Sequence, residues 1–197
     1  MNFARLIKNH LKEHLVTMEK LEAHAAFIED LAKRILTSLD AGGKVIFFGN
    51  GGSAADAQHL AAEFVVRYRQ NRRALAGIAL TTDTSILTAC ANDFGFDSIY
   101  ARQIEALANP GDVVIGISTS GNSANVVQGL QAAKEKGCLT VAFTAQEGGE
   151  CATIADLAFR APSTVTARAQ ECHLFVGHVL CDLIEEATIE KAEKPGP

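Results

Sequence analysis

A histidine and a glutamate follow a glycine-rich turn at a spacing that could support chemistry. The turn reads GNGGS at residues 49–53, and His59 and Glu63 lie in the segment of strong helix formers that follows it. Residues four positions apart lie about one turn apart on the same face of a helix. Such a pair could bind a metal ion, or act as an acid and a base. The alternative is an ordinary solvent-exposed pair on a surface helix.

Hydroxyl side chains are concentrated in a second turn, which reads STSGNS at residues 118–123. It follows a continuous apolar run and precedes a helical pattern, so its side chains would lie at a helix N-terminus, where anions bind favourably. These side chains could instead simply cap the helix, as Ser53 is expected to cap the helix after the glycine turn. Because two such turns follow two strands of one expected sheet, phosphate binding is favoured. The hydroxyl groups are those of Ser118, Thr119, Ser120 and Ser123.

The glycine turn does not match a nucleotide-binding motif. No Gly-Lys-Ser or Gly-Lys-Thr follows it, as a P-loop would require. Asp56 stands where the third glycine or alanine of a GxGxxG dinucleotide motif would be expected. The sequence therefore predicts an anion site without a nucleotide cofactor.

The helical segment expected over residues 165–192 carries three more candidates, Gln170, His173 and His178. Apolar side chains surround both histidines in the sequence. A histidine in so apolar a stretch is usually a core residue with its hydrogen bonds satisfied, and we expect this of His173. His178 becomes a candidate for chemistry once a partner is available.

Composition and charge argue against several classes of protein. The chain has 197 residues and a net charge of −5, whereas nucleic-acid-binding proteins usually carry a basic face. No apolar run approaches the length of a membrane span, and the N-terminus does not look like a secretory signal. The five cysteines include no CxxC pair, which indicates reduced thiols. We therefore expect a cytoplasmic protein that binds neither nucleic acid nor membrane, although a local basic patch could form from Arg67, Arg69, Arg72 and Arg73.

The apolar pattern indicates the elements that must position these residues. Apolar residues at helical spacing predict one or two amphipathic helices over residues 1–38, ended by AGG at 41–43. Short continuous apolar runs then alternate with helical patterns, which is typical of an α/β doubly wound parallel sheet. Ligands of such sheets bind beyond the carboxyl ends of the strands, here after the first and third strands. The strands are expected at 44–50, 77–81, 112–118, 139–144 and 156–161, and the helices at roughly 53–69, 84–92, 97–108, 122–136 and 165–192.

Four segments together resemble the sugar isomerase, or SIS, domain family. They read GNGGSAADAQHLAAEF at 49–64, ANDFGF at 91–96, ISTSGNSANV at 117–126 and ARAQECHLFVGH at 167–178. The likeness covers essentially the whole chain, and within the family it is closest to the bacterial sedoheptulose 7-phosphate isomerases. It implies a single SIS domain over residues 1–197. The implied fold is a three-layer, flavodoxin-like α/β core with five parallel strands at 41–197, preceded by oligomerisation helices at 1–40.

The resemblance also implies roles for individual residues. Glu63 and His178 match the pair assigned to proton transfer. Zinc is the implied cofactor, because the zinc ligands seen in members of the family match His59, Glu63, Gln170 and His178. The family's substrate-binding positions match Asn50, Gly51, Gly52, Ser53, Glu63, Asn92, Asp93, Ser118, Thr119, Ser120, Ser123 and Gln170.

The implied reaction converts D-sedoheptulose 7-phosphate to D-glycero-D-manno-heptose 7-phosphate through an enediol, the first step of ADP-heptose synthesis for lipopolysaccharide. Which of Glu63 and His178 takes the C1 proton is left open. The alternative is a non-catalytic relative of the same fold that binds the bacterial replication initiator and has serine and asparagine at these two positions. The presence of Glu63 and His178 favours the isomerase.

The resemblance further implies a homotetramer, with the N-terminal helices packed at its centre and the sites at subunit boundaries. An apolar stripe within residues 6–39 is compatible with this arrangement. Arg67 could then reach the phosphate bound by a neighbouring subunit. The alternative for Arg67 is an ordinary solvent-exposed charge.

Overall fold

A computed structural model describes residues 1–193, and the last four residues of the expected domain, 194–197, lie outside them. The chain begins with two helices, α1 (Phe3–Glu19) and α2 (Ala25–Asp40), joined by the 3-10 helix η1 (Lys20–His24). Strands and helices alternate after α2. The strands are β1 (Val45–Gly49), β2 (Gly77–Ala79), β3 (Val113–Ile117), β4 (Leu139–Thr144) and β5 (Leu157–Arg160). The helices are α3 (Gly52–Val65), α4 (Thr84–Phe94), the 3-10 helix η2 (Phe96–Ser98), α5 (Ile99–Leu107), α6 (Ala124–Glu135), α7 (Gly149–Ile154) and α8 (Thr166–Glu193).

The five strands form one parallel sheet in the order β2-β1-β3-β4-β5. This is the flavodoxin-like order, so the predicted fold class is confirmed. Every residue of β1 and β3 is buried, as their continuous apolar sequence predicts for strands covered on both faces. The two strands are neighbours, with Gly49 opposite Ile117 at their carboxyl ends. The turns after β1 and β3 therefore leave the sheet side by side.

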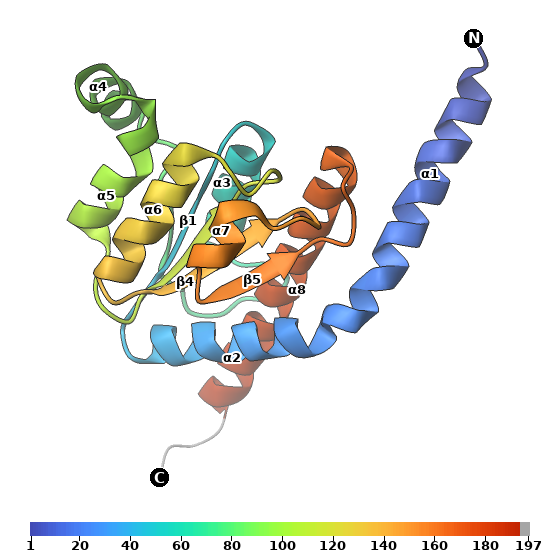
Figure 1. Cartoon of the computed structure of the whole chain (residues 1–197). Helices are drawn as coiled ribbons and strands as arrows, with labels where there is room; N and C mark the ends of the chain where they lie inside the picture. The colour runs from blue at the N-terminus through green and yellow to red at the C-terminus, as the bar shows by residue number, and fades with distance from the viewer. Residues whose placement is uncertain (194–197) are drawn as a thin grey trace.

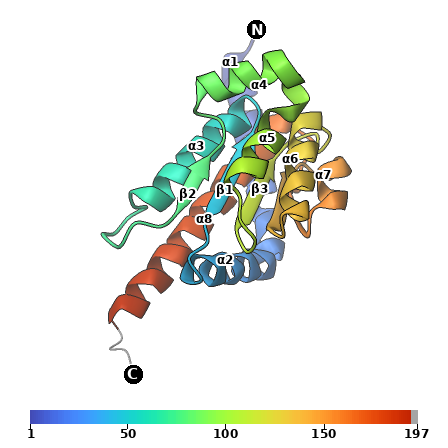
Figure 2. The same cartoon turned by 90° about the vertical axis from the view of Figure 1, so that its left-hand side faces the viewer.

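Helices cover both faces of the sheet and make three layers (Figures 1 and 2). One apolar cluster joins α2, α3 and α8 to one face of the sheet, with Leu31, Ile35 and Phe47 among its buried members. A second cluster joins α4, α5, α6 and α7 to the other face around Phe48 and Ile104. The 28-residue helix α8 packs against both α2 and α3. It therefore connects the N-terminal region to the helix that follows the glycine turn.

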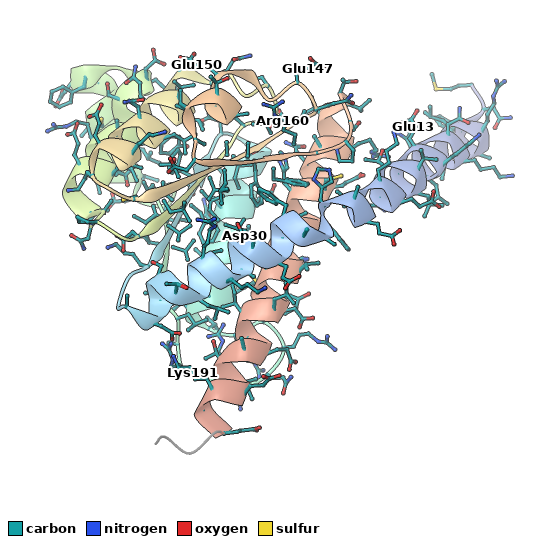
Figure 3. The ribbon with its side chains drawn as sticks, turned by 60° about the horizontal axis from the view of Figure 1, so that its bottom comes forward. Glu13, Asp30, Glu147, Glu150, Arg160 and Lys191 are labelled. Atoms are coloured by element: carbon teal, nitrogen blue, oxygen red, sulfur yellow. The ribbon has the colours of Figure 1, made fainter. Side chains whose placement is uncertain are left out.

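The two N-terminal helices differ in their burial. The inner face of α2 is buried against the sheet, whereas α1 extends away from the α/β core (Figure 1). In Figure 3 the labelled Glu13 lies on this projecting part and Asp30 lies on α2, against the core. The exposed apolar side chains of α1 are Phe3, Leu6, Ile7, Leu11, Leu15 and Val16. Within residues 1–193, no helix is long and apolar enough to cross a membrane.

Three local details differ from the sequence-based expectations. Helix α3 ends at Val65, four residues earlier than expected, and the short helix α7 was not expected. The prediction that Ser53 caps α3 is wrong. Gly51, with a φ of 57°, occupies the N-cap position and makes no side-chain hydrogen bond. The helix therefore starts at Gly52, and Ser53 is already inside its first turn, where its side chain is buried.

Candidate active site

The turns after β1 and β3 are joined by a pair of amide side chains. Asn50 Nδ2 donates to Asn125 Oδ1 at 2.8 Å, and Asn125 Nδ2 donates to Asn50 Oδ1 at 2.9 Å. The buried Tyr100 hydroxyl donates to the carbonyl oxygen of Gly49 and also lies 3.3 Å from Asn50 Oδ1. Burial raises the pKa of Tyr100 to about 12, so this hydroxyl remains a donor. The glycine turn is thus fixed to the start of α6 and to α5.

Three of the hydroxyl groups in the second turn bond to one another. Ser118 Oγ lies 3.0 Å from Ser123 Oγ and 3.4 Å from Ser120 Oγ. Ser123 is the N-cap residue of α6, yet its side chain makes no capping hydrogen bond. The capping alternative therefore does not describe Ser123. The side chain of Thr119 is half-buried in the same turn. The arrangement leaves hydroxyl groups and the N-terminal end of α6 available to an anion.

Gly121 allows this turn to pack closely on the segment before α7. Its φ is 69°, and a Cβ atom at this position would lie 2.0 Å from the carbonyl oxygen of Gly148. The backbone N–H of Cys151 donates to the carbonyl of Gly121 at 2.8 Å. Asn122 Oδ1 accepts from the backbone N–H of Glu150 at 2.9 Å. These contacts from outside the turn do not use the serine hydroxyl groups, although within the turn Ser120 Oγ accepts from the backbone N–H of Asn122 at 3.2 Å.

His59, Glu63 and His178 are brought together by α3 and α8. His59 Nε2 lies 2.7 Å from His178 Nε2 and 3.7 Å from Glu63 Oε1. The His178 ring also packs on Tyr68, with their centroids 5.6 Å apart. The spacing of His59 and Glu63 alone left a surface pair as an alternative. The structure instead gives this pair a third member from a helix more than a hundred residues later.

Burial shifts the pKa values of two groups at this cluster, His178 and Asp56. It lowers the pKa of His178, and the adjacent His59 lowers it further, while Glu63 and Asp56 act in the opposite direction. Burial raises the pKa of Asp56, which the two histidines partly oppose. The ordinary pKa of a histidine is about 6.5, so His178 is mainly neutral near pH 7 and can accept a proton.

The remaining predicted residues lie on three elements. Gln170, on α8, lies against the glycine turn, because a Cβ atom at Gly52 would be 2.8 Å from its Nε2. Asn92 and Asp93 are exposed on α4, and Asn92 Nδ2 donates to Asp93 Oδ1 at 2.8 Å. Helix α4 runs across the carboxyl end of the sheet (Figure 2). In the described part of the chain, no hydrogen bond or ion pair joins Asn92 or Asp93 to the histidine cluster.

The donors present fit a zinc ion by chemical type, since zinc binds imidazole nitrogens and carboxylate oxygens. Two tetrahedral nitrogen ligands of one zinc ion lie roughly 3.3 Å apart, given Zn–N bonds of about 2.0–2.1 Å. The Nε2 atoms of His59 and His178 are closer than this, at 2.7 Å, so the rings would separate slightly around a metal. Over residues 1–193, no three His, Cys, Asp or Glu side chains are already arranged for metal binding. Zinc binding therefore stays a prediction.

Two other expectations can be compared with the structure. His173 is buried in the core as predicted, its Nε2 lies 2.9 Å from the Thr144 carbonyl oxygen, and burial lowers its pKa to about 4. The expectation that all its hydrogen bonds are satisfied is wrong, because its buried Nδ1 has no partner among the described residues. The four arginines do not form one basic patch. Arg67 is exposed and donates to Asn71 Oδ1 at 2.9 Å, whereas the Arg72 side chain is only 3% exposed.

Five residues of the site region were missed by the sequence reasoning. Asn125 lies two positions after the hydroxyl turn and could have been noticed as a polar residue at the start of a helix. The others act through contacts that local spacing does not reveal. They are Asp56, Tyr68, Tyr100 and Arg72, whose partners lie on other elements.

Comparisons with known proteins agree on one family. A family model described as SIS domain matches residues 9–145. The phosphoheptose isomerase of Aquifex aeolicus is 56% identical over 177 residues, which are 90% of this chain and 93% of that protein. The phosphoheptose isomerase of Paramagnetospirillum magneticum is 53% identical over 186 residues, which are 94% of this chain and 97% of that protein.

Two solved structures are also similar to this chain. The phosphoheptose isomerase from Neisseria gonorrhoeae has a TM-score of 0.88 and 40% identity, covering 94% of this chain and all of that one (100%). A phosphoheptose isomerase from Francisella tularensis has a TM-score of 0.90 and 32% identity, with the same coverage of 94% and 100%. The likeness therefore extends over the whole α/β core and both turns.

The packing of the hydroxyl turn predicts that Gly121→Ala weakens phosphate binding. The new Cβ atom would meet the Gly148 backbone, so the turn must move. Backbone strain of this kind costs about 1–3 kcal/mol, which corresponds to about tenfold weaker binding or more. Titration calorimetry with inorganic phosphate measures this.

Gly111→Ala is the matched control for this substitution. Gly111 also has a positive φ, 88°, but no atom lies within 4 Å of its added Cβ. Gly111→Ala should therefore strain the local backbone but leave the affinity for phosphate unchanged. Equal affinities in wild type and Gly121→Ala would show that phosphate does not bind at this turn.

Proposed function

The chain belongs to the phosphoheptose isomerases of the SIS domain family, and we propose that its site interconverts D-sedoheptulose 7-phosphate and D-glycero-D-manno-heptose 7-phosphate. The observation that carries this proposal is the meeting of Glu63 and His178 in one cluster on α3 and α8. Helix α3 starts directly from the glycine turn, which is bonded to the hydroxyl turn through Asn125. An anion-binding turn and an acid-base pair are thus parts of one connected unit.

The reaction moves a hydrogen between two neighbouring carbons of the sugar. A base removes the C1 proton of the ketose, the electrons form an enediol, and a proton is returned at C2 while another is exchanged between the oxygens. Glu63 and His178 are the groups that we propose for these transfers. The lowered pKa of His178 favours its neutral form, which can accept a proton and later return it.

The hydroxyl turn would hold the other end of the substrate. Ser118, Thr119, Ser120 and Ser123 would donate to the 7-phosphate at the N-terminal end of α6. Fixing the phosphate restricts the position of the distant C1 and C2 atoms and lowers the entropic cost of reaching the reactive geometry. The glycine turn, Gln170 and the Asn92-Asp93 pair are the proposed contacts of the sugar chain. Their hydrogen-bonding groups suit its hydroxyl groups.

A zinc ion is the proposed cofactor. His59, Glu63, Gln170 and His178 would hold it, and their two imidazoles and one carboxylate are ordinary zinc ligands. When bound, it would polarise sugar oxygens and stabilise negative charge near them. An atom that binds the metal cannot also accept a proton, so the roles of Glu63 and His178 would depend on whether the metal is bound. Gln170 and His178 both lie on α8, eight residues or about two turns apart.

A homotetramer is the proposed assembly. Helix α1 carries a stripe of exposed apolar side chains that the chain itself does not cover. A further, mainly apolar groove of about 600 Å³ lies between α8 and the segment from the end of α1 through η1 to α2, with Leu21, Ile28, Phe175 and Val179 among its lining residues. Apolar surface of this extent on a folded chain is typical of a protein interface.

A metabolic role and a cellular location are also proposed for the reaction. The product would supply ADP-heptose synthesis for lipopolysaccharide, as the family resemblance implies. A cytoplasmic location is consistent with the five cysteines, all of which are free and buried.

The acid-base assignment predicts that Glu63→Gln and His178→Ala each lower kcat by about 10²- to 10⁴-fold, because each removes a proton-transfer group. Turnover of sedoheptulose 7-phosphate by the purified variants measures this. Glu105→Gln is a control, since Glu105 is an exposed residue of α5 paired with Arg102. Near-wild-type rates in both site variants would exclude the assignment.

The metal proposal predicts about one zinc ion per chain in purified protein, in keeping with a single four-ligand site. His59→Ala should lose most of it, because one of the two imidazole donors is removed. Elemental analysis after dialysis gives the zinc content directly. His10→Ala, at an exposed histidine of α1, should keep it. Unchanged zinc in His59→Ala would remove His59 from the ligand set.

The assembly proposal predicts that a charge in the α1 stripe dissociates the tetramer. Leu11 is 57% exposed, so Leu11→Asp should leave the fold intact while placing a charge inside the interface. Size-exclusion chromatography with light scattering should show a tetramer for wild type and smaller species for the variant. Asn9→Asp introduces a charge about 160° around the helix from Leu11 and should not dissociate the tetramer. A monomeric wild-type protein would contradict the proposal.

A further inference from the structure

Glu185, on α8, is almost completely buried and binds the segment that follows α3. Its side chain is 1% exposed. Its Oε1 accepts from the backbone N–H groups of Arg69 and Gln70, both at 2.7 Å, and its Oε2 accepts from that of Tyr68 at 2.8 Å. Burial by itself would raise the pKa of Glu185, but these hydrogen bonds and the charge of Arg72 outweigh it and lower the pKa. The carboxylate is therefore ionised and holds three consecutive amides on α8.

Arg72 returns from the same segment to the end of α3. Its side chain is 3% exposed, and its Nε lies 3.4 Å from Glu185 Oε2. Its Nη2 donates to the carbonyl oxygen of Glu63 at 2.7 Å, and its Nη1 donates to that of Phe64 at 2.8 Å. The last carbonyl groups of a helix have no partner within the helix, and a cation near them is favourable. Arg72 thus terminates the helix that carries Glu63.

These contacts reach both members of the acid-base pair. Glu63 is itself one of the residues whose carbonyl group Arg72 binds. Glu185 lies seven residues after His178, or about two turns of α8, so both side chains point from the same face of that helix. The Tyr68 amide is held by Glu185, and the Tyr68 ring packs on the His178 ring. The buried ion pair of Arg72 and Glu185 therefore contacts the backbone of Glu63 directly and the ring of His178 through Tyr68.

We propose that Arg72 and Glu185 are positioning residues for the isomerisation. They form a buried clamp that ties the last turn of α3 to α8 and so sets the Glu63 carboxylate relative to the His178 imidazole. A displacement of about 1 Å in a catalytic group can cost about 10²-fold in rate, so the position of this turn matters. The clamp rests on the proposed function, because the pair it positions is the proposed acid and base.

The alternative is that the ion pair only stabilises the fold. A buried ion pair contributes little net stability compared with apolar residues of similar volume, since its desolvation cost offsets its attraction. Removing one partner is different, because an unpaired buried charge is left behind. A substitution of both partners therefore separates the two roles.

The single variant Glu185→Gln tests the clamp with a side chain of nearly the same shape. We expect kcat for sedoheptulose 7-phosphate to fall by about 10- to 100-fold in the folded protein. We expect KM to change by less than about threefold, because the hydroxyl turn lies on a different element. Glu186→Gln is the matched control, since Glu186 is the exposed next residue of α8 and accepts from the Gln70 side chain. It should retain wild-type kcat, and an equal fall in both variants would overturn the proposal.

The double variant Arg72→Met with Glu185→Gln decides the question if the single variant does not fold. Both buried charges are then absent, so the double variant should melt at a higher temperature than Glu185→Gln alone, which leaves the buried Arg72 unpaired. The clamp predicts that kcat remains about 10- to 100-fold low despite this stability. Wild-type kcat in the stable double variant would overturn the positioning role.

Amide hydrogen exchange tests the clamp independently of turnover. At least one of the backbone N–H groups of residues 68–70 should exchange about tenfold faster or more in the double variant, because glutamine offers one acceptor oxygen where the carboxylate offers two. The same amides should be unchanged in Glu186→Gln. Unchanged exchange in the double variant would overturn the clamp. An inactive wild-type protein with the expected exchange pattern would instead overturn the proposed function and leave the clamp standing.

Discussion

The parallel pairing of β1 with β3 is the constraint on which the whole site depends. It places the carboxyl ends of two strands beside each other, although about seventy residues separate them in the chain. The glycine turn and the hydroxyl turn must then leave the sheet at the same edge. The reciprocal amide bonds of Asn50 and Asn125 use this proximity. Without the pairing, neither the hydroxyl turn nor the start of α3 would have a fixed position.

Sequence reasoning succeeded where the signal was local. Continuous apolar runs identified all five strands. The reason is burial on both faces for β1, β3 and most of β4, whereas the edge strands β2 and β5 are only partly buried. The glycine and hydroxyl turns were recognisable from residue type alone. Glu63 and His178 were recognised through family resemblance, since their separation of more than a hundred residues carries no periodic signal. The structure places both in one cluster with His59.

Sequence reasoning failed where a distant partner decides the role of a residue. Arg72 lies in a run of arginines that could form a basic patch, yet its side chain is buried against Glu185 and two carbonyl groups of α3. Ser53 follows two glycines and has the residue type of an N-cap. Gly51, whose φ is positive, takes the N-cap position instead. Helix α3 therefore begins one residue before Ser53, and Ser53 does not make the expected capping hydrogen bond. Propensity describes a segment in isolation, whereas these outcomes depend on packing.

The position of helix α8 at the end of the chain also affects the order in which parts of the fold can form during synthesis. This helix follows all five strands in the chain, and its Val176, Leu180 and Ile184 complete the apolar layer over one face of the sheet. His59 and His178 are 119 residues apart, so their contact closes one of the longest loops in the domain. A ribosome releases the glycine turn, the hydroxyl turn and the sheet long before α8 emerges. The cluster of His59, Glu63 and His178 is therefore absent from every earlier stage of synthesis, and one face of the sheet remains exposed until the last helix arrives.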